Sequence, residues 1–259
     1  MKTKVELILV PLELDRKPAT GRLDTICVVF DILRATSTIA TALHNGAREV
    51  LVVSEIAEAL ALQAGRPSLL LAGERDGQRI PASLTGSVAF DLGNSPREFT
   101  RERVENRSIV TTTTNGTRAI NSCQWAEMIL AASFLNLSAT AGLLRASEPE
   151  RIRLVCAGTG DDFSLEDTLG VGALLSLLPA DRFDTSLDAC GMAIELYRSA
   201  RNNLEEVLAD SVNGRRLAAR EELRGDIAFC ARQDVILNPV RVTDNVARFV
   251  SGSGEPTSQ

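Results

Sequence analysis

The stretch TTTTNGTRAI, residues 111–120, decides between two kinds of fold. It follows the apolar pair Ile109-Val110, and its β-branched threonines favour a strand. The dipeptide Asn115-Gly116 is typical of a tight turn, so one interpretation is a β-hairpin. The residues that follow, 117–123, have a helical pattern instead. The stretch therefore predicts a strand, a turn and a helix, which is the unit of an α/β fold.

The same alternation runs through the first 160 residues. Short runs that are apolar throughout are typical of strands covered on both faces. Such runs occupy residues 5–10, 25–32, 50–53, 69–72, 109–113, 128–132 and 152–157. Helical patterns lie between them at residues 37–44, 56–64, 96–104, 118–125 and 137–146. We therefore expect a layered α/β/α fold with a central sheet that is mostly parallel or mixed.

The remaining third of the chain is helical in pattern. Residues 164 to about 224 look helical almost throughout, with breaks expected near Pro179 and at Asn213-Gly214. A chain of 259 residues suits one large domain. We predict a single α/β domain over residues 1–250, within which residues 180–224 could form a helical subdomain. The polar tail at 251–259 is expected to be disordered.

Composition excludes several classes of partner. The net charge of −6 argues against nucleic-acid binding and against binding to an acidic membrane surface. There is neither an apolar run of membrane-spanning length nor a signal peptide. Five cysteines without CxxC spacing predict buried free thiols in a reducing cytoplasm. We expect a cytoplasmic protein with a small anionic ligand, and the sequence leaves a homo-oligomer open.

In a sheet of this kind, ligands bind outside the carboxyl ends of the strands. The polar residues that directly follow each apolar run are therefore the candidates, and we expect them to share one end of the sheet. Asp31 follows Val28-Val29-Phe30, and Arg34 comes three residues later. The pair could be a structural ion pair, or Asp31 could act as a metal ligand or acid/base group while Arg34 faces an anion. Thr36 and Ser37 are suitable N-caps for the next helix.

Two more strand ends carry charged or amide side chains. Glu74 and Arg75 follow the run at 69–72 and could form either an ordinary charged turn or a ligand site. Asp91 and Asn94 belong to the stretch DLGNSPREF at 91–99. In that stretch Ser95, Pro96 and Glu98 fit a capping box, which leaves Asp91 and Asn94 without a structural explanation.

The opening stretch itself is a candidate anion site. Thr114, Asn115 and Thr117 lie at the predicted turn, where hydroxyl groups and backbone N–H groups meet the positive end of a helix. Arg118 could donate two hydrogen bonds to two anion oxygens. The lysine and glycine spacing of a Walker A loop is absent. A well-capped turn without a ligand is the alternative.

An acidic segment follows the run at 152–157. Ser164 and Asp167 fit a capping box, while Asp161, Asp162, Glu166 and Asp167 together favour a hard cation such as Mg²⁺. Cys156 lies inside the apolar run, where inert thiols are usual, although a nucleophile is the alternative. Carboxylates, arginines and hydroxyl groups at strand ends are together the composition of a metal-assisted phosphoryl site.

These motifs resemble those of the 2-phosphosulfolactate phosphatase family. The resembling stretches are DILRATSTI at 31–39, AGER at 72–75, DLGNSP at 91–96, TTTNGTRA at 112–119, FLN at 134–136, VCAG at 155–158, SLED at 164–167 and GDIAFCARQD at 225–234. They occur in family order through nearly all of the chain. The loop at 76–88 departs from the family, whose members typically carry a shorter stretch there.

The resemblance implies a Mg²⁺-dependent hydrolase that converts 2-phospho-3-sulfolactate to 3-sulfolactate and phosphate, a step of coenzyme M biosynthesis in some organisms. The expected catalytic residues are Asp31, Arg34, Arg118 and Asp167. The expected metal ligands are Asp31, Glu74, Asp91 and Asp167, and the expected substrate-binding residues are Arg75, Asn94, Thr114, Asn115 and Thr117. The alternatives are a phosphatase of another small 2-phospho acid and a non-catalytic binder of anionic metabolites.

Overall fold

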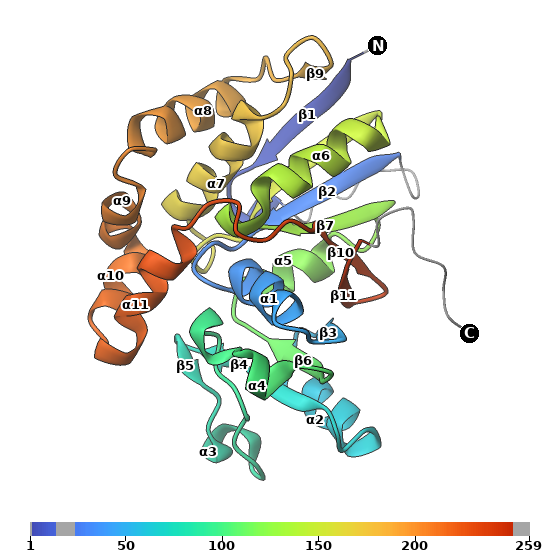
Figure 1. Cartoon of the computed structure of the whole chain (residues 1–259), viewed down its shortest axis with the longest axis vertical. Helices are drawn as coiled ribbons and strands as arrows, with labels where there is room; N and C mark the ends of the chain where they lie inside the picture. The colour runs from blue at the N-terminus through green and yellow to red at the C-terminus, as the bar shows by residue number, and fades with distance from the viewer. Residues whose placement is uncertain (1, 14–23, 251–259) are drawn as a thin grey trace.

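The computed structural model describes residues 2–13 and 24–250, and in them the chain forms one eleven-stranded sheet with helices on both faces (Figure 1). The strands are β1 Thr3–Ile8, β2 Thr25–Phe30, β3 Glu49–Val52, β4 Leu70–Arg75, β5 Gln78–Arg79, β6 Ser108–Thr112, β7 Met128–Ala132, β8 Arg151–Cys156, β9 Phe183–Asp184, β10 Val240–Thr243 and β11 Val246–Phe249. The α-helices are α1 Ala35–His44, α2 Ile56–Gly65, α3 Ala82–Thr85, α4 Arg101–Val104, α5 Gly116–Ser122, α6 Leu137–Ser147, α7 Leu165–Ser176, α8 Asp188–Ala200, α9 Leu204–Asp210, α10 Val212–Ala218 and α11 Glu221–Cys230. Short 3₁₀ helices occupy Pro11–Glu13, Pro96–Glu98 and Phe134–Asn136.

The sheet is mixed, and a hairpin divides it. The strand order is β5-β4-β6-β3-β11-β10-β7-β2-β8-β1-β9. Strands β4, β6 and β3 form one parallel group, and β7, β2, β8, β1 and β9 form another. Between them β10 and β11 pair antiparallel with each other and with both neighbours. The two parallel groups therefore run in opposite senses along the sheet. The predicted layered α/β fold with a mixed sheet is confirmed.

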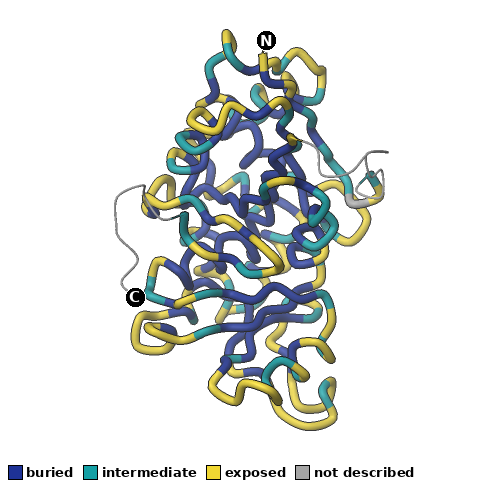
Figure 2. Tube along the Cα trace, turned by 90° about the vertical axis from the view of Figure 1, so that its right-hand side faces the viewer, coloured by how far each residue is buried: buried dark blue, intermediate teal, exposed yellow. Residues whose placement is uncertain are grey.

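Alternate residues of β2 face two different parts of the core. Val28 and Phe30 pack with apolar side chains of α6, α7 and α8, whereas Cys27 and Val29 pack with those of α1 and α5. This period of two places apolar residues on both faces of a central strand, as the uninterrupted apolar runs predicted. Figure 2 shows the buried strands inside a surface of exposed turns. All five cysteines are buried and free, as expected.

The helices of the last third share this core. Cys190 of α8, Leu208 of α9, Leu217 of α10 and Ile227 of α11 belong to the same apolar cluster as Phe30. The residues of the predicted 180–224 subdomain thus pack on the central sheet. The predicted tail at 251–259 lies outside the described residues. Within those residues, no helix combines the length and the apolar character needed to cross a membrane.

The predicted helix break at Asn213-Gly214 is wrong, because α10 runs through both residues. Ser211 caps α10, since its Oγ accepts a hydrogen bond of 3.0 Å from Gly214 N. A Cβ at position 214 would overlap the carbonyl group of Leu208. Gly214 is therefore the residue that lets α10 approach the end of α9. The capping box at Ser164 is partly confirmed, because its Oγ accepts from Asp167 N at 3.3 Å at the start of α7.

Contact between α7 and α8 also depends on a glycine, and this gives a first prediction. A Cβ at Gly172 would overlap the carbonyl group of Ala193, so we expect Gly172→Ala to lower the free energy of unfolding by about 1–3 kcal/mol. Gly142 in α6 is the matched control, because a Cβ there meets no other atom. Gly142→Ala should instead stabilise the protein by about 0.5–1 kcal/mol, through helix propensity. Urea unfolding measures both, and equal effects would contradict the close approach.

Candidate functional site

A cavity of about 530 Å³ is lined by residues at the ends of strands from both parallel groups. Its walls come from the segments after β2, β4, β6 and β8 and from the α10–α11 region. The lining residues are Asp31, Leu33, Arg34, Glu74, Asp76, Gly77, Asn94, Thr114, Asn115, Thr159, Gly160, Asn213, Arg216, Leu217 and Arg220. The expectation that all candidates share one end of the sheet is wrong. The two parallel groups run in opposite senses, so their carboxyl ends do not lie at one end of the sheet. Segments that follow strands of both groups nevertheless line this cavity.

Asp31 is fixed at the end of β2 by the turn that leads into α1. Its Oδ1 accepts a hydrogen bond of 3.1 Å from Ala35 N. Thr36 is not the N-cap of α1, because the helix begins at Ala35 and the Thr36 hydroxyl instead bonds both Asp31 N and Asp31 O. A Cβ at Gly116 would overlap the other carboxylate oxygen, Oδ2. The glycine of the opening stretch therefore allows α5 to begin directly against the Asp31 carboxylate.

Burial and like charges raise the pKa of Asp31. The residue is only 9% exposed, and burial, together with the charges of Glu74 and Glu166, raises its pKa to about 7. The Ala35 N–H group and Arg34 act in the opposite direction. Burial, together with Asp31 and Glu166, also raises the pKa of Asp167 well above its ordinary value. Several carboxylates thus compete for protons in one poorly solvated region.

Glu74 joins two turns of the cavity wall. Its Oε1 accepts from Thr114 N at 2.8 Å, and its Oε2 accepts from Gly77 N at 2.7 Å. The first bond holds the turn after β6, and the second holds the turn between β4 and β5. The predicted strand–turn–helix at 111–120 is confirmed, and Glu74 is the side chain that fixes its turn.

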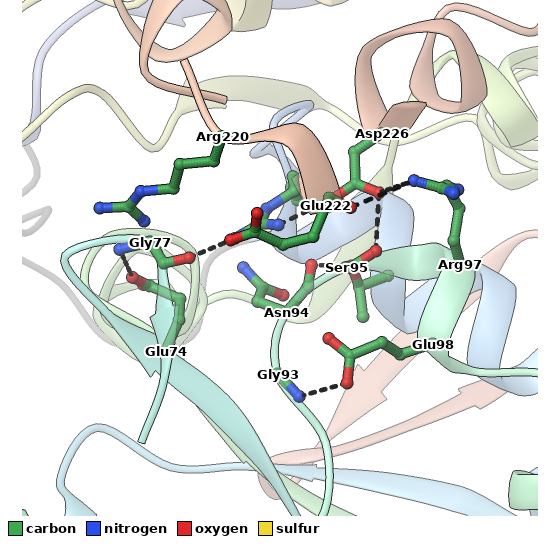
Figure 3. A network of polar contacts seen from close by, with 12 residues as sticks. Glu74, Gly77, Gly93, Asn94, Ser95, Arg97, Glu98, Arg220, Glu222 and Asp226 are labelled. Atoms are coloured by element: carbon green, nitrogen blue, oxygen red, sulfur yellow. Dashed lines mark hydrogen bonds and ion pairs between the residues drawn. The ribbon is translucent and has the colours of Figure 1, made fainter. Parts of the chain in front are cut away.

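The Arg34 guanidinium forms an ion pair with a buried carboxylate of α11. Its Nη1 lies 2.7 Å from Asp226 Oδ2, with side-chain exposures of 3% and 0%, and its Nη2 donates to Gly77 O at 3.0 Å. Asp226 also accepts from Ser95 Oγ at 2.6 Å and lies 3.7 Å from Arg97 Nη1 (Figure 3). The predicted capping box is therefore wrong at Ser95, whose hydroxyl bonds Asp226. Glu98 accepts from Gly93 N at 3.1 Å.

Six of the predicted site residues line the cavity: Asp31, Arg34, Glu74, Asn94, Thr114 and Asn115. The other five lie outside its lining. Asp167 is buried beneath it and accepts from Ile32 N and Gly158 N, while Asp91 accepts from Leu71 N. Arg75 donates hydrogen bonds to Thr112 Oγ1 and to two carbonyl groups. Thr117 is hydrogen-bonded to Thr113, and Arg118 is exposed on α5. Their functional roles stay predictions.

Comparison with known sequences identifies the family. The sequence profile of 2-phosphosulpholactate phosphatase matches residues 13–244. The chain belongs to the 2-phosphosulfolactate phosphatase family. A protein of Thermotoga maritima named probable 2-phosphosulfolactate phosphatase is 42% identical over 208 residues, which cover 80% of this chain and 85% of the relative. A relative of the same name from Caldanaerobacter subterraneus is 42% identical over 211 residues (80% and 83% covered), and one from Synechococcus is 38% identical over 227 residues (85% and 89% covered).

The cavity of this family member also contains residues that the strand-end argument missed. They come mainly from α10 and the turn before α11: Asn213, Arg216, Leu217 and Arg220. Asn213, Arg216 and Leu217 have the spacing i, i+3 and i+4 of one face of α10, and that periodicity could have revealed them. Arg220 has an extended backbone beyond the end of α10, so the same periodicity does not place it. Asp226 lies in the matched stretch at 225–234, but its buried partner Arg34 is 192 positions away.

The residues of the cavity fit a hard cation of the magnesium type. Over the described part of the chain, no group of three or more His, Cys, Asp or Glu side chains is arranged to hold a metal ion. Mg²⁺ usually takes only one or two carboxylates and fills its other positions with water and phosphate oxygens. Asp31 and Glu74 supply two carboxylates at the cavity wall. A bound cation would also relieve the repulsion that raises the pKa of Asp31.

The raised pKa of Asp31 predicts an unusual dependence of stability on pH. The folded protein holds this proton more tightly than the unfolded chain, so the free energy of unfolding of the metal-free protein should fall as the pH rises from about 4 to about 7. Asp31→Asn removes the titration and should be more stable than the wild type at pH 8 by roughly 1–3 kcal/mol, with little difference near pH 4. Urea unfolding in chelator measures this, with the exposed Asp181→Asn as control. Parallel pH profiles for wild type and Asp31→Asn would contradict it.

The ion pair of Arg34 and Asp226 gives a further prediction. Asp226→Asn leaves the Arg34 charge buried without its partner, so we expect unfolding to become easier by about 3–5 kcal/mol. Arg97→Gln is the control, because that guanidinium is 46% exposed and lies at the longer distance from Asp226. It should change stability by less than about 1 kcal/mol. Denaturant unfolding measures both variants. Similar losses of stability would contradict the prediction, because the Arg34–Asp226 pair would then matter no more than the Arg97–Asp226 contact.

Proposed function

We propose that this chain is a Mg²⁺-dependent phosphatase that hydrolyses 2-phospho-3-sulfolactate to 3-sulfolactate and phosphate. The observation that carries the proposal is the cavity, in which the buried carboxylate of Asp31 lies in the same wall as the Arg34 guanidinium and the Thr114-Asn115 turn. Family membership and the printed names of the relatives support the choice of substrate. The proposal places the reaction in the cytoplasm and, where an organism makes coenzyme M, in that biosynthesis.

The side chains of the cavity can bind and orient the phosphate group. Arg34 is rigid, because Asp226 and Gly77 O hold its two terminal nitrogens, and its face toward the cavity can pair with phosphate oxygens. The amide groups of Asn94 and Asn115 and the Thr114 hydroxyl offer further donors in the lining. Arg34 is fixed before the substrate arrives, so its guanidinium needs little reorganisation in the reaction.

Asp31 and Glu74 would hold Mg²⁺, which would supply positive charge to the phosphate oxygens. In hydrolysis, water adds its hydroxyl group to phosphorus, and the bridging oxygen leaves as the 2-hydroxyl of 3-sulfolactate with a proton. In the metal-free site burial raises the pKa of Asp31 to about 7, and a bound cation would lower it again, so Asp31 would then be an ionised ligand. Cys156 is a poor candidate nucleophile, since burial raises the pKa of its thiol well above the ordinary value.

Phosphate release tests this function. With 2-phospho-3-sulfolactate and Mg²⁺ we expect turnover, and excess chelator should abolish it. Asp31→Asn should lower kcat by roughly 100-fold or more, because it removes a charged ligand of the metal. Asp181→Asn is the control, since this carboxylate is exposed and lies outside the cavity lining, and it should keep kcat within about threefold.

Three outcomes would contradict the proposal. Full phosphatase activity in excess chelator would show that hydrolysis does not need Mg²⁺. If another 2-phospho acid in a substrate panel has a higher kcat/KM, that acid replaces 2-phospho-3-sulfolactate as the proposed substrate. Tight binding of these acids without any release of phosphate makes the protein a binder of anionic metabolites.

A further inference from the structure

Two arginines at the cavity have no carboxylate partner among the described residues. Arg216 of α10 donates to Asn213 Oδ1 at 3.3 Å, and Arg220, which precedes α11, donates to Asp76 O at 3.1 Å. Both acceptors are neutral, so neither offsets the charge of its guanidinium. Figure 3 shows Arg220 extending toward the turn that carries Gly77. The cavity therefore contains two positive charges that an anion could pair with.

The contrast with Arg34 divides the cavity into two regions. Arg34 is buried, and the carboxylate of Asp226 balances its charge. Arg216 is exposed and Arg220 is half-buried, so both lie toward the solvent side. The inner region thus holds Asp31, Glu74 and a neutralised arginine. The outer region holds the two arginines and the exposed carboxylate of Asp76, which leaves one net positive charge.

The outer arginines are held in place by the fold. Asn213, one turn before Arg216, donates from its Nδ2 to Thr159 Oγ1 at 2.8 Å and to Glu166 Oε1 at 2.6 Å. Gly214 fixes the close approach of α10 to α9. The two guanidinium groups carry like charges and line the same cavity, so they repel each other. A bound anion would remove that repulsion.

We propose that Arg216 and Arg220 form the subsite for the sulfonate group of the substrate. The inference rests on the proposed function and deepens it. In 2-phospho-3-sulfolactate the sulfur atom is one bond farther from phosphorus than the carboxylate carbon is. With phosphate at Asp31 and Arg34, the sulfonate is the anion that extends toward the outer region. Its three oxygens stay ionised at all relevant pH values, and arginine can donate two hydrogen bonds to such a group.

A pair of substrates and a pair of variants test the subsite. 2-Phospholactate matches the substrate except that it lacks the sulfonate. Arg216→Gln and Arg220→Gln should each lower kcat/KM for 2-phospho-3-sulfolactate by about 10- to 100-fold, mainly through KM, because a charged hydrogen bond is lost. Both variants should change kcat/KM for 2-phospholactate by less than about threefold.

Arg215→Gln is the matched control. Arg215 lies beside Arg216 in α10 but donates to Asp210 O outside the cavity lining, so both substrates should behave as with the wild type. Equal losses for both substrates in the Arg216 and Arg220 variants would overturn the inference, because the arginines would then serve the phosphate or the fold. Unchanged kinetics with both substrates would overturn it as well.

Calorimetric titration with 3-sulfolactate in the presence of Mg²⁺ separates this inference from the proposed function. We expect the dissociation constant of 3-sulfolactate to rise by about 10- to 100-fold in each variant, while Arg215→Gln stays at the wild-type value. If the wild type hydrolyses neither phospho acid, the proposed function fails, but this titration still decides the subsite. An unchanged dissociation constant in both variants overturns it.

Discussion

The buried ion pair between Arg34 and Asp226 is the interaction on which the rest of the site depends. It joins the segment after β2 to α11 across 192 positions of sequence, and Ser95 and Gly77 complete the network on either side. A buried ion pair adds little net stability over an apolar contact, but removing either charge is severe. Its value here is geometric, because it fixes a guanidinium at the cavity wall and fixes the last helices against the sheet at the same point.

The carboxylates impose the opposite constraint. Asp31 and Asp167 both have raised pKa values because they are buried close to each other and to Glu166. Such a cluster opposes folding at neutral pH, and backbone N–H groups from Ala35, Ile32 and Gly158 offset part of that penalty. The chain tolerates the repulsion at the place where a cation would relieve it. The electrostatic strain of the site and its affinity for a metal would then have one cause.

Local pattern was sufficient for seven of the eleven strands, the strand–turn–helix at 111–120 and six cavity residues, because each depends on neighbours in sequence. Local pattern failed where a residue far away in the sequence determines the local structure. Ser95 has the sequence of an N-cap, yet the buried Asp226 takes its hydroxyl group. Gly214 is typical of a break, yet α9 requires a residue without a side chain there. The hairpin of β10 and β11 has strands of only four residues, too short for alternation to identify, so the reversal of the sheet could not be foreseen.

The turn at Asp76-Gly77 connects these constraints to the loop at residues 76–88, where we expect the sequence to depart from the family. Both residues adopt left-handed backbone angles, with φ of 55° and 74°, which aspartate and glycine tolerate better than most residues. That conformation presents the carbonyl groups of Asp76 to Arg220 and of Gly77 to Arg34. The turn therefore contacts the inner and the outer arginine through its backbone. Because both contacts use backbone carbonyl groups, neither depends on the side chain of Asp76.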